Sequence, residues 1–419
     1  MKSKRTLYLV VVLLLAGSMA GCGIDIPQLA RATSTATATL QAAVLPTPTP
    51  EPTSPPAETP TPVPVPPRPD DFEQYPDTIV RYLNDSGGDE DGLRAMLGSW
   101  DALRHVTDLL RVDVDDDGTG ELLMVVVEQS LDYVINLRGD VLVVDPDGDD
   151  YRLGYRAAAD SIALDPALIE VDDLNRDGHT DLAFSSTECG AHTCFTTVHI
   201  VTSGTGMYEN LTGDGIEMSY VDPYFSDWDG DGVPELIMHG GTIGSVGAGP
   251  QRERTEVYKW DGAVYVLAET MNDYSNYLYF KVLDANQAIM GGDYETAARL
   301  YREAVDNPGL EVWMEESERE KLVAFSRYRL SLIYLITGGI ELAEATRDEL
   351  LSAQPDNIYA QVVTLLWDAY QREPSLQSAC EEVGRFAASH PEAAEVLADF
   401  GYGNPTFTAD EVCPIQLFQ

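Results

Sequence analysis

Apolar residues follow two different patterns along this chain, and the pattern changes near residue 273. Between residues 111 and 272 they form short runs rich in β-branched and aromatic residues, separated by stretches containing Asp, Gly or Pro, which predicts β-strands. From 273 to 419 the pattern changes to that of helices. We expect strands at 122–127, 141–144, 151–155, 181–185, 196–201, 207–211, 235–238, 256–260 and 264–267.

The stretch 71–110, before the first strand, has a helical pattern of its own. We expect helices at 77–83 and 90–103, separated by a Ser-Gly-Gly sequence. They would cap the strand region and bury apolar residues against its first strand. These residues are Leu93, Met96, Leu97 and Trp100.

The N-terminal 70 residues predict export and anchoring. Residues 1–21 combine a basic start with an apolar run, as in a secretory signal peptide. Residues 19–22, Met-Ala-Gly-Cys, resemble a bacterial lipobox, which implies cleavage before Cys22 and its acylation, with palmitate as an expected acyl group. An ordinary signal peptide with an unrelated cysteine is the alternative. Residues 22–70 are rich in Thr and Pro and predict a disordered stalk, so we expect a lipid-anchored protein on the extracytoplasmic face of the cell membrane.

One acidic loop recurs three times in the strand region, at spacings of 60 and 54 residues. Each copy has oxygen-bearing side chains at loop positions 1, 3, 5 and 9 and a glycine at position 6. Such a loop can turn alternate side chains toward one hard cation, and calcium accepts this oxygen cage. The predicted ligands are Asp113, Asp115, Asp117 and Glu121; Asp173, Asn175, Asp177 and Asp181; and Asp227, Asp229, Asp231 and Glu235. Three acidic turns without metal are the alternative.

The residues after each loop decide its class. An EF-hand carries a bidentate Glu on a helix at position 12, where this chain has Met124, Phe184 and Met238 within predicted strands. An acidic loop that leads directly into a strand resembles the FG-GAP or integrin-type repeat, over roughly residues 105–270. The resemblance implies up to three structural Ca²⁺ ions and about three β-propeller-like blades of about four strands each. Three blades fall short of a usual propeller, so we expect a short array or an unusual closure.

Four cysteines besides Cys22 are expected to form two disulfides in an exported protein. Cys189 and Cys194 flank a short turn between strands, and Cys380 and Cys413 could close a loop near the C-terminus. The alternative at the first pair is a metal site made by Cys189, His192 and Cys194, with Glu188 as a further candidate ligand.

The helical region 273–419 resembles tetratricopeptide repeats. The pattern is clearest in one predicted helix and the residues just before it, and two looser copies follow at Ala343 and Ala379. The resemblance implies a solenoid with a concave face for a peptide or protein partner. An unrelated stack of helical hairpins is the alternative. The residues of the first copy are Gly292, Tyr294, Ala297, Tyr301 and Ala304.

Charge and motifs narrow the function. The formal net charge of −44 disfavours nucleic acid as a partner. The sequence has no His-Glu-x-x-His zinc helix, no Gly-x-Ser-x-Gly elbow and no phosphate-binding loop with Lys. We therefore expect a non-catalytic α+β multidomain lipoprotein that binds or scaffolds partner proteins. An exported carbohydrate-active or other hydrolytic enzyme and a polysaccharide-binding module are the alternatives.

Overall fold

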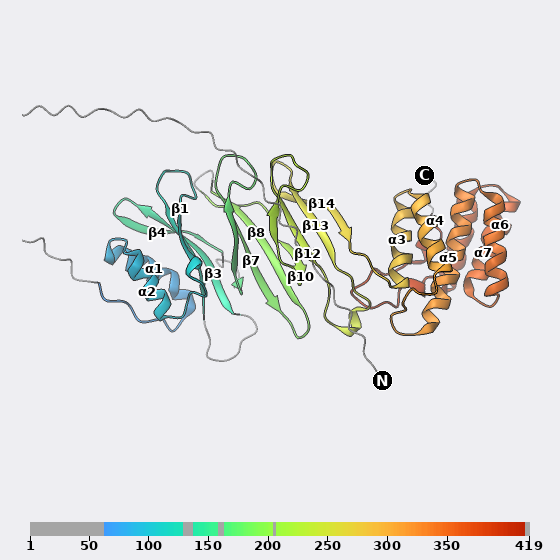
Figure 1. Ribbon diagram of the computed structural model, residues 1–419, viewed down its shortest axis with the longest axis horizontal. Coiled ribbons are helices and arrows are strands. Elements are labelled where there is room, and N and C mark those ends of the chain that lie inside the picture. The colour runs from blue at the N-terminus through green and yellow to red at the C-terminus, as the bar shows by residue number, and fades with distance from the viewer. Residues whose placement is uncertain (1–62, 129–136, 158–162, 204–206, 415–419) are drawn as a thin grey trace, which may run out of the picture. The chain divides into compact units, whose positions relative to one another are not determined.

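The computed structural model describes residues 63–128, 137–157, 163–203 and 207–414 (Figure 1). The predicted signal peptide 1–21, the lipidation site Cys22 and most of the stalk 22–70 lie outside these residues. All described residues belong to one unit, which begins at Thr61.

Two helices precede the first strand, one at each of the two predicted positions. They follow a 3-10 turn, Phe72–Gln74, and are α1 (Tyr75–Ser86) and α2 (Glu90–Ser99). Gly87 caps the C-terminal end of α1, and its φ of 66° is a left-handed conformation that glycine adopts without strain. Asp89 is the N-cap of α2, and its side chain accepts a hydrogen bond from the N–H of Gly92. It ends at Ser99, earlier than predicted.

The strand region forms three antiparallel sheets, one after the other along the chain (Figure 1). The first sheet has the order β1-β2-β3-β4, with β5 paired to β3; the second has β10-β8-β7-β6, with β9 paired to β8; the third has β11-β12-β13-β14. The first sheet contains β1 (Leu109–Val112), β2 (Glu121–Val127), β3 (Arg138–Asp147), β4 (Asp150–Arg156) and β5 (Ala163–Leu164). The second contains β6 (Ala167–Asp172), β7 (Asp181–Cys189), β8 (Cys194–Thr202), β9 (Glu209–Asn210) and β10 (Ile216–Ser219). The third contains β11 (Tyr224–Ser226), β12 (Glu235–Gly240), β13 (Arg254–Trp260) and β14 (Tyr265–Asn272).

The sheets pack through their faces. Alternate residues of a strand point to opposite faces, and β2 contributes to two cores. Met124 and Val126 pack with the residues of α1 and α2, whereas Leu123 and Val125 share a core with Leu182 of the second sheet. A further core joins the second and third sheets. The expectation of a mixed α+β chain is therefore confirmed, and the described residues form no closed barrel or propeller.

In the described chain, six long helices follow the third sheet: α3 (Leu278–Met290), α4 (Tyr294–Asp306), α5 (Glu316–Ile336), α6 (Ile340–Ala353), α7 (Ile358–Arg372) and α8 (Leu376–Ser389). Two 3-10 turns and the short helix α9 (Ala409–Val412) complete the described chain. Ala297, Ala343 and Ala379 are fully buried in the core of this region, which allows close approach of neighbouring helices. No helix among the described residues has the length and apolar character needed to cross a bilayer.

Candidate metal centres

Each acidic loop connects two neighbouring antiparallel strands. The ninth residue of each loop is buried and holds the start of the loop through a hydrogen bond. The pairs are β1 and β2, β6 and β7, and β11 and β12. The ninth residues Glu121, Asp181 and Glu235 are 2%, 0% and 2% exposed. Each carboxylate accepts a hydrogen bond from the backbone N–H of its loop's second residue. These bonds measure 2.6 Å from Val114, 3.1 Å from Leu174 and 2.7 Å from Trp228.

The three loops share two further hydrogen bonds. The fifth residue's N–H donates to the third residue's side-chain oxygen at 3.2, 2.9 and 3.1 Å in the three loops. The seventh residue's N–H donates to the fifth residue's carboxylate at 2.7, 2.9 and 2.8 Å. At position 6, Gly118, Gly178 and Gly232 have φ values of 88°, 94° and 92°, which L-residues with side chains rarely adopt. The sequence repeat is thus a repeat of local backbone structure.

The loops differ in how closely their carboxylates gather. In the first loop, oxygen atoms of all four predicted ligands lie within 4.8 Å of one another. In the third loop, Asp227, Asp229 and Glu235 do so, without Asp231. Within the described part of the chain, the carboxylates of the second loop form no such group. There the Asn175 amide donates to the Asp177 carboxylate at 3.0 Å. The first loop therefore comes nearest to a formed cation site.

The residue opposite position 9 on the next strand differs in all three copies. The register places Asp145 across from Glu121, because Leu122 pairs with Val144. In the second sheet Asp181 pairs with Thr202 directly. In the third sheet Leu236 pairs with Tyr258, which places Lys259 across from Glu235. The same register position therefore carries a negatively charged, a neutral and a positively charged side chain in the three sheets.

At the first loop, Asp145 adds a fifth carboxylate. Asp145 as a whole residue is 6% exposed, and its Oδ2 is 2.7 Å from the Arg152 guanidinium. The other oxygen, and Oδ1 of Asp113, are buried and accept no hydrogen bond from the described residues. Burial raises the pKa of both Glu121 and Asp145. A buried carboxylate oxygen without a donor is costly, and a cation bound among these groups would relieve that cost.

In the charge of the residue opposite position 9, the second loop lies between the other two. Burial is the main cause that raises the pKa of Asp181 to about 6. Asp173 and Asp181 each have one buried oxygen without a hydrogen-bond donor among the described residues. Asn175 and Thr202 offer oxygen ligands but no charge, so this loop presents less negative charge than the first.

The third loop carries its own cation. The Lys259 ammonium donates a hydrogen bond to Asp229 Oδ2 and lies 3.6 Å from Glu235 Oε1. The hydrogen bond to Asp229 raises the pKa of Lys259, and the same bond lowers the pKa of Asp229. A metal ion bound here would have to displace the ammonium or lie beside it.

The structure joins the cysteines in the predicted pairs. Cys189 is bonded to Cys194 across the β7–β8 hairpin, with an S–S distance of 1.98 Å. Cys380 of α8 is bonded to Cys413 with an S–S distance of 1.96 Å. Both sulfurs of the first pair are used in this bond, so they are not offered as thiolate ligands to a metal beside His192.

Sequence reasoning missed three groups that bear on the sites. Asp145 and Lys259 are far from the loops in sequence, and only the pairing of β2 with β3 and of β12 with β13 brings them there. The third group joins His239, Glu253 and Asp273, whose ligand atoms lie within 4.8 Å of one another. An alignment of the three predicted hairpins could have found Asp145 and Lys259, since each lies at the same register position.

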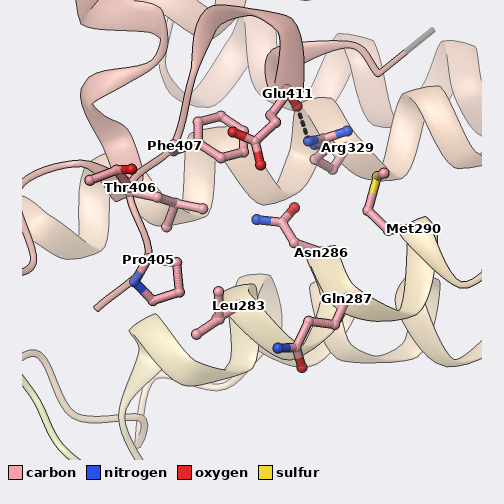
Figure 2. Close-up of a pocket in the computed structure, with 10 residues that line it drawn as sticks. Leu283, Asn286, Gln287, Met290, Arg329, Pro405, Thr406, Phe407 and Glu411 are labelled. Atoms are coloured by element: carbon pink, nitrogen blue, oxygen red, sulfur yellow. Dashed lines mark hydrogen bonds between the residues drawn. The ribbon is translucent and has the colours of Figure 1, made fainter. Parts of the chain in front are cut away.

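A pocket of about 210 Å³ lies in the helical region, between α3, α5 and the segment leading to α9 (Figure 2). Apolar side chains of Leu283, Met290 and Phe407 line it, together with the Asn286 amide. Arg329 is 1% exposed at its edge, and it donates a hydrogen bond to the backbone carbonyl of Glu411. Its guanidinium lies 5.9 Å from the centre of the Phe407 ring. Arg329 thereby fastens the C-terminal segment to α5 beside the opening.

Comparison with known proteins finds no matching family model, no matching curated protein and no matching solved structure.

Proposed function

We propose that this protein is a non-catalytic, cell-surface lipoprotein that binds or scaffolds partner proteins and is stabilised by calcium in its acidic loops. The observation that supports the calcium part most strongly is the first loop, where Asp113, Asp115, Asp117 and Glu121 converge within 4.8 Å. Their ligand atoms are all oxygens, which Ca²⁺ prefers. Like charges at this separation repel one another unless a counter-cation is present.

The calcium ions are proposed to be structural, up to three per chain, with the loops filling in the order first, second, third. Modules outside the cell bind calcium with Kd values of about 10⁻⁴–10⁻³ M. Each loop connects two strands of one sheet, so an ion there would hold the hairpin and its ninth residue in place. The sheets would then be FG-GAP-like blades in a short, open array.

The helical region is proposed to bind the partner, as a tetratricopeptide-like solenoid. The pocket in Figure 2 supports this proposal, because it combines apolar side chains of Leu283, Met290 and Phe407 with the polar Asn286 amide, as binding pockets usually do. Acylated Cys22 and the Thr/Pro-rich stalk would hold both folded regions on the extracytoplasmic face of the cell membrane.

Thermal unfolding tests the calcium part of this proposal. Adding calcium to metal-free protein should raise the melting temperature, because an ion that binds only the folded state stabilises it by about 1.4 kcal/mol at tenfold excess over Kd. For the strand region 111–272, this stabilisation corresponds to an increase in melting temperature of about 3–6 °C per ion. A chelator should reverse the shift, and magnesium at equal concentration should reproduce little of it. Melting curves that neither calcium nor chelator moves would refute the proposal.

A further inference from the structure

Outside the acidic loops, one histidine and two carboxylates converge at one end of the third sheet. His239 lies near the end of β12, Glu253 directly precedes β13, and Asp273 directly follows β14. Their ligand atoms lie within 4.8 Å of one another, although they come from three different strands or strand ends. We propose that these three side chains form a binding site for a first-row transition-metal cation, and that Zn²⁺ is the ion it suits.

The separations of the ligand atoms are close to those of a zinc site, and the Glu253 and Asp273 oxygens lie within 4.8 Å of each other. Nε2 of His239 lies 3.3 Å from Oδ2 of Asp273 and 3.9 Å from Oε2 of Glu253. A tetrahedral zinc ion with bonds of about 2.0–2.1 Å holds neighbouring ligand atoms about 3.3 Å apart. One contact already has this length, and a small side-chain movement of Glu253 would shorten the other.

The backbone holds the three positions in register. His239 pairs with Thr255 on β13, and the N–H of Asp273 donates to the carbonyl of Glu253 at 2.9 Å. The ligands therefore project from paired strands, which position side chains more firmly than an isolated loop does.

The charges favour a cation. Within the described residues, neither Glu253 nor Asp273 forms a salt bridge with Lys or Arg, and each has only His239 as a partner of possible positive charge. The two arginines next to Glu253 in the sequence form ion pairs with other carboxylates: Arg252 with Asp284, and Arg254 with Glu256. With neutral imidazole, the site has two negative charges and one nitrogen ligand.

The donor set separates this site from the acidic loops. Imidazole nitrogen is a ligand for Zn²⁺ and its neighbours in the first transition row, whereas Ca²⁺ and Mg²⁺ prefer oxygen alone. Three protein ligands leave the fourth position of a tetrahedral zinc to water or to a side chain of another molecule. All three side chains are exposed, so this position is accessible from solution.

The test is calorimetric titration of the protein with Zn²⁺ in excess calcium, which keeps the acidic loops occupied. We expect about one zinc ion per chain, and His239→Ala should remove it. Asp273→Asn and Glu253→Gln should each weaken zinc binding by at least about 10–100-fold. Loss of a residue that only hydrogen-bonds to a metal ligand already lowers metal affinity by that factor, and these two residues are proposed to bind the metal directly. These exposed, near-isosteric changes leave the core untouched. Co²⁺ supplies a second readout, because four-coordinate cobalt has a visible absorption that the His239→Ala variant should lack.

The matched control is His192→Ala, which removes another exposed histidine and should leave zinc binding unchanged. No zinc uptake by the wild-type protein would overturn the proposal, as would uptake that His239→Ala leaves intact. The site stands apart from the calcium proposal. If the loops bind no calcium, the difference between the wild-type protein and His239→Ala still reports on zinc alone.

Discussion

Replacing Glu121 with alanine is expected to lower the stability of the metal-free protein and to abolish calcium binding at the first loop. The Glu121 carboxylate is buried and accepts a hydrogen bond from the Val114 N–H at 2.6 Å. Val114 is itself fully buried, so the truncation leaves an amide without a partner, at a cost of about 1–3 kcal/mol. Loss of the calcium ligand removes a further stabilisation of about 1.4 kcal/mol at tenfold excess of calcium over Kd.

Glu121→Gln separates the two effects. Its amide oxygen can still accept the hydrogen bond from Val114, but the charge of the calcium ligand is gone. Metal-free Glu121→Gln should therefore unfold near the wild-type denaturant midpoint, while the calcium-induced increase in stability becomes smaller. Denaturant unfolding with and without calcium measures both quantities. If calcium stabilises Glu121→Gln as much as it does the wild-type protein, Glu121 is a structural cap and not a calcium ligand.

Replacing Lys259 with methionine is expected to strengthen calcium binding at the third loop by about tenfold. The ammonium contacts Asp229 and lies 3.6 Å from Glu235 Oε1, so it neutralises the carboxylates that would bind the ion. The site is partly exposed, and repulsion between an ammonium and a nearby divalent cation is reduced there by solvent. The expected gain is therefore modest for an electrostatic change, but it makes a weak site measurable by calorimetric titration.

Two variants control for net charge and for the identity of the cation. Lys321→Met removes an exposed lysine on α5 and should leave calcium binding unchanged, since this residue is not among those at any loop. Lys259→Arg keeps the positive charge and should bind calcium at the third loop no more tightly than the wild-type protein. Equal calcium affinities in the wild-type and Lys259→Met proteins would show that the ammonium does not compete with the ion.

The sequence predicted the strands that contribute most to the cores. Runs such as Leu-Leu-Met-Val-Val-Val in β2 are apolar on both faces, and both faces are buried between α1 and α2 and the second sheet. The strand before each loop was missed. Neither β6 nor the three-residue β11 contains a fully buried residue, so neither has the long buried apolar run that marks β2.

Helix ends and strand ends were less predictable than their centres. The pattern at 90–103 continued past the end of α2, because Trp100 and Ala102 are buried without being helical. The strand expected at 207–211 is only Glu209–Asn210 in the structure. In both places tertiary packing buries apolar residues that lie outside regular elements, and hydrophobic periodicity cannot separate the two cases.

The loop ligands were predictable because spacing within one hairpin is local. The chemistry of each site also depends on a residue across the sheet, and Asp145, Thr202 and Lys259 become equivalent only through strand register. The same limit explains why the cluster around His239 was missed, since its members come from three strands.

Equilibrium dialysis of metal-free protein against radioactive calcium tests the central claim most directly. The loops predict about two bound ions per chain near 1 mM free calcium, with a third appearing only as calcium is raised further. The Asp117→Ala variant should bind about one ion fewer, because its first loop loses a carboxylate from the cluster with Asp113, Asp115 and Glu121. Absence of bound calcium at these concentrations, or unchanged binding by Asp117→Ala, would contradict the assignment of the acidic loops as calcium sites.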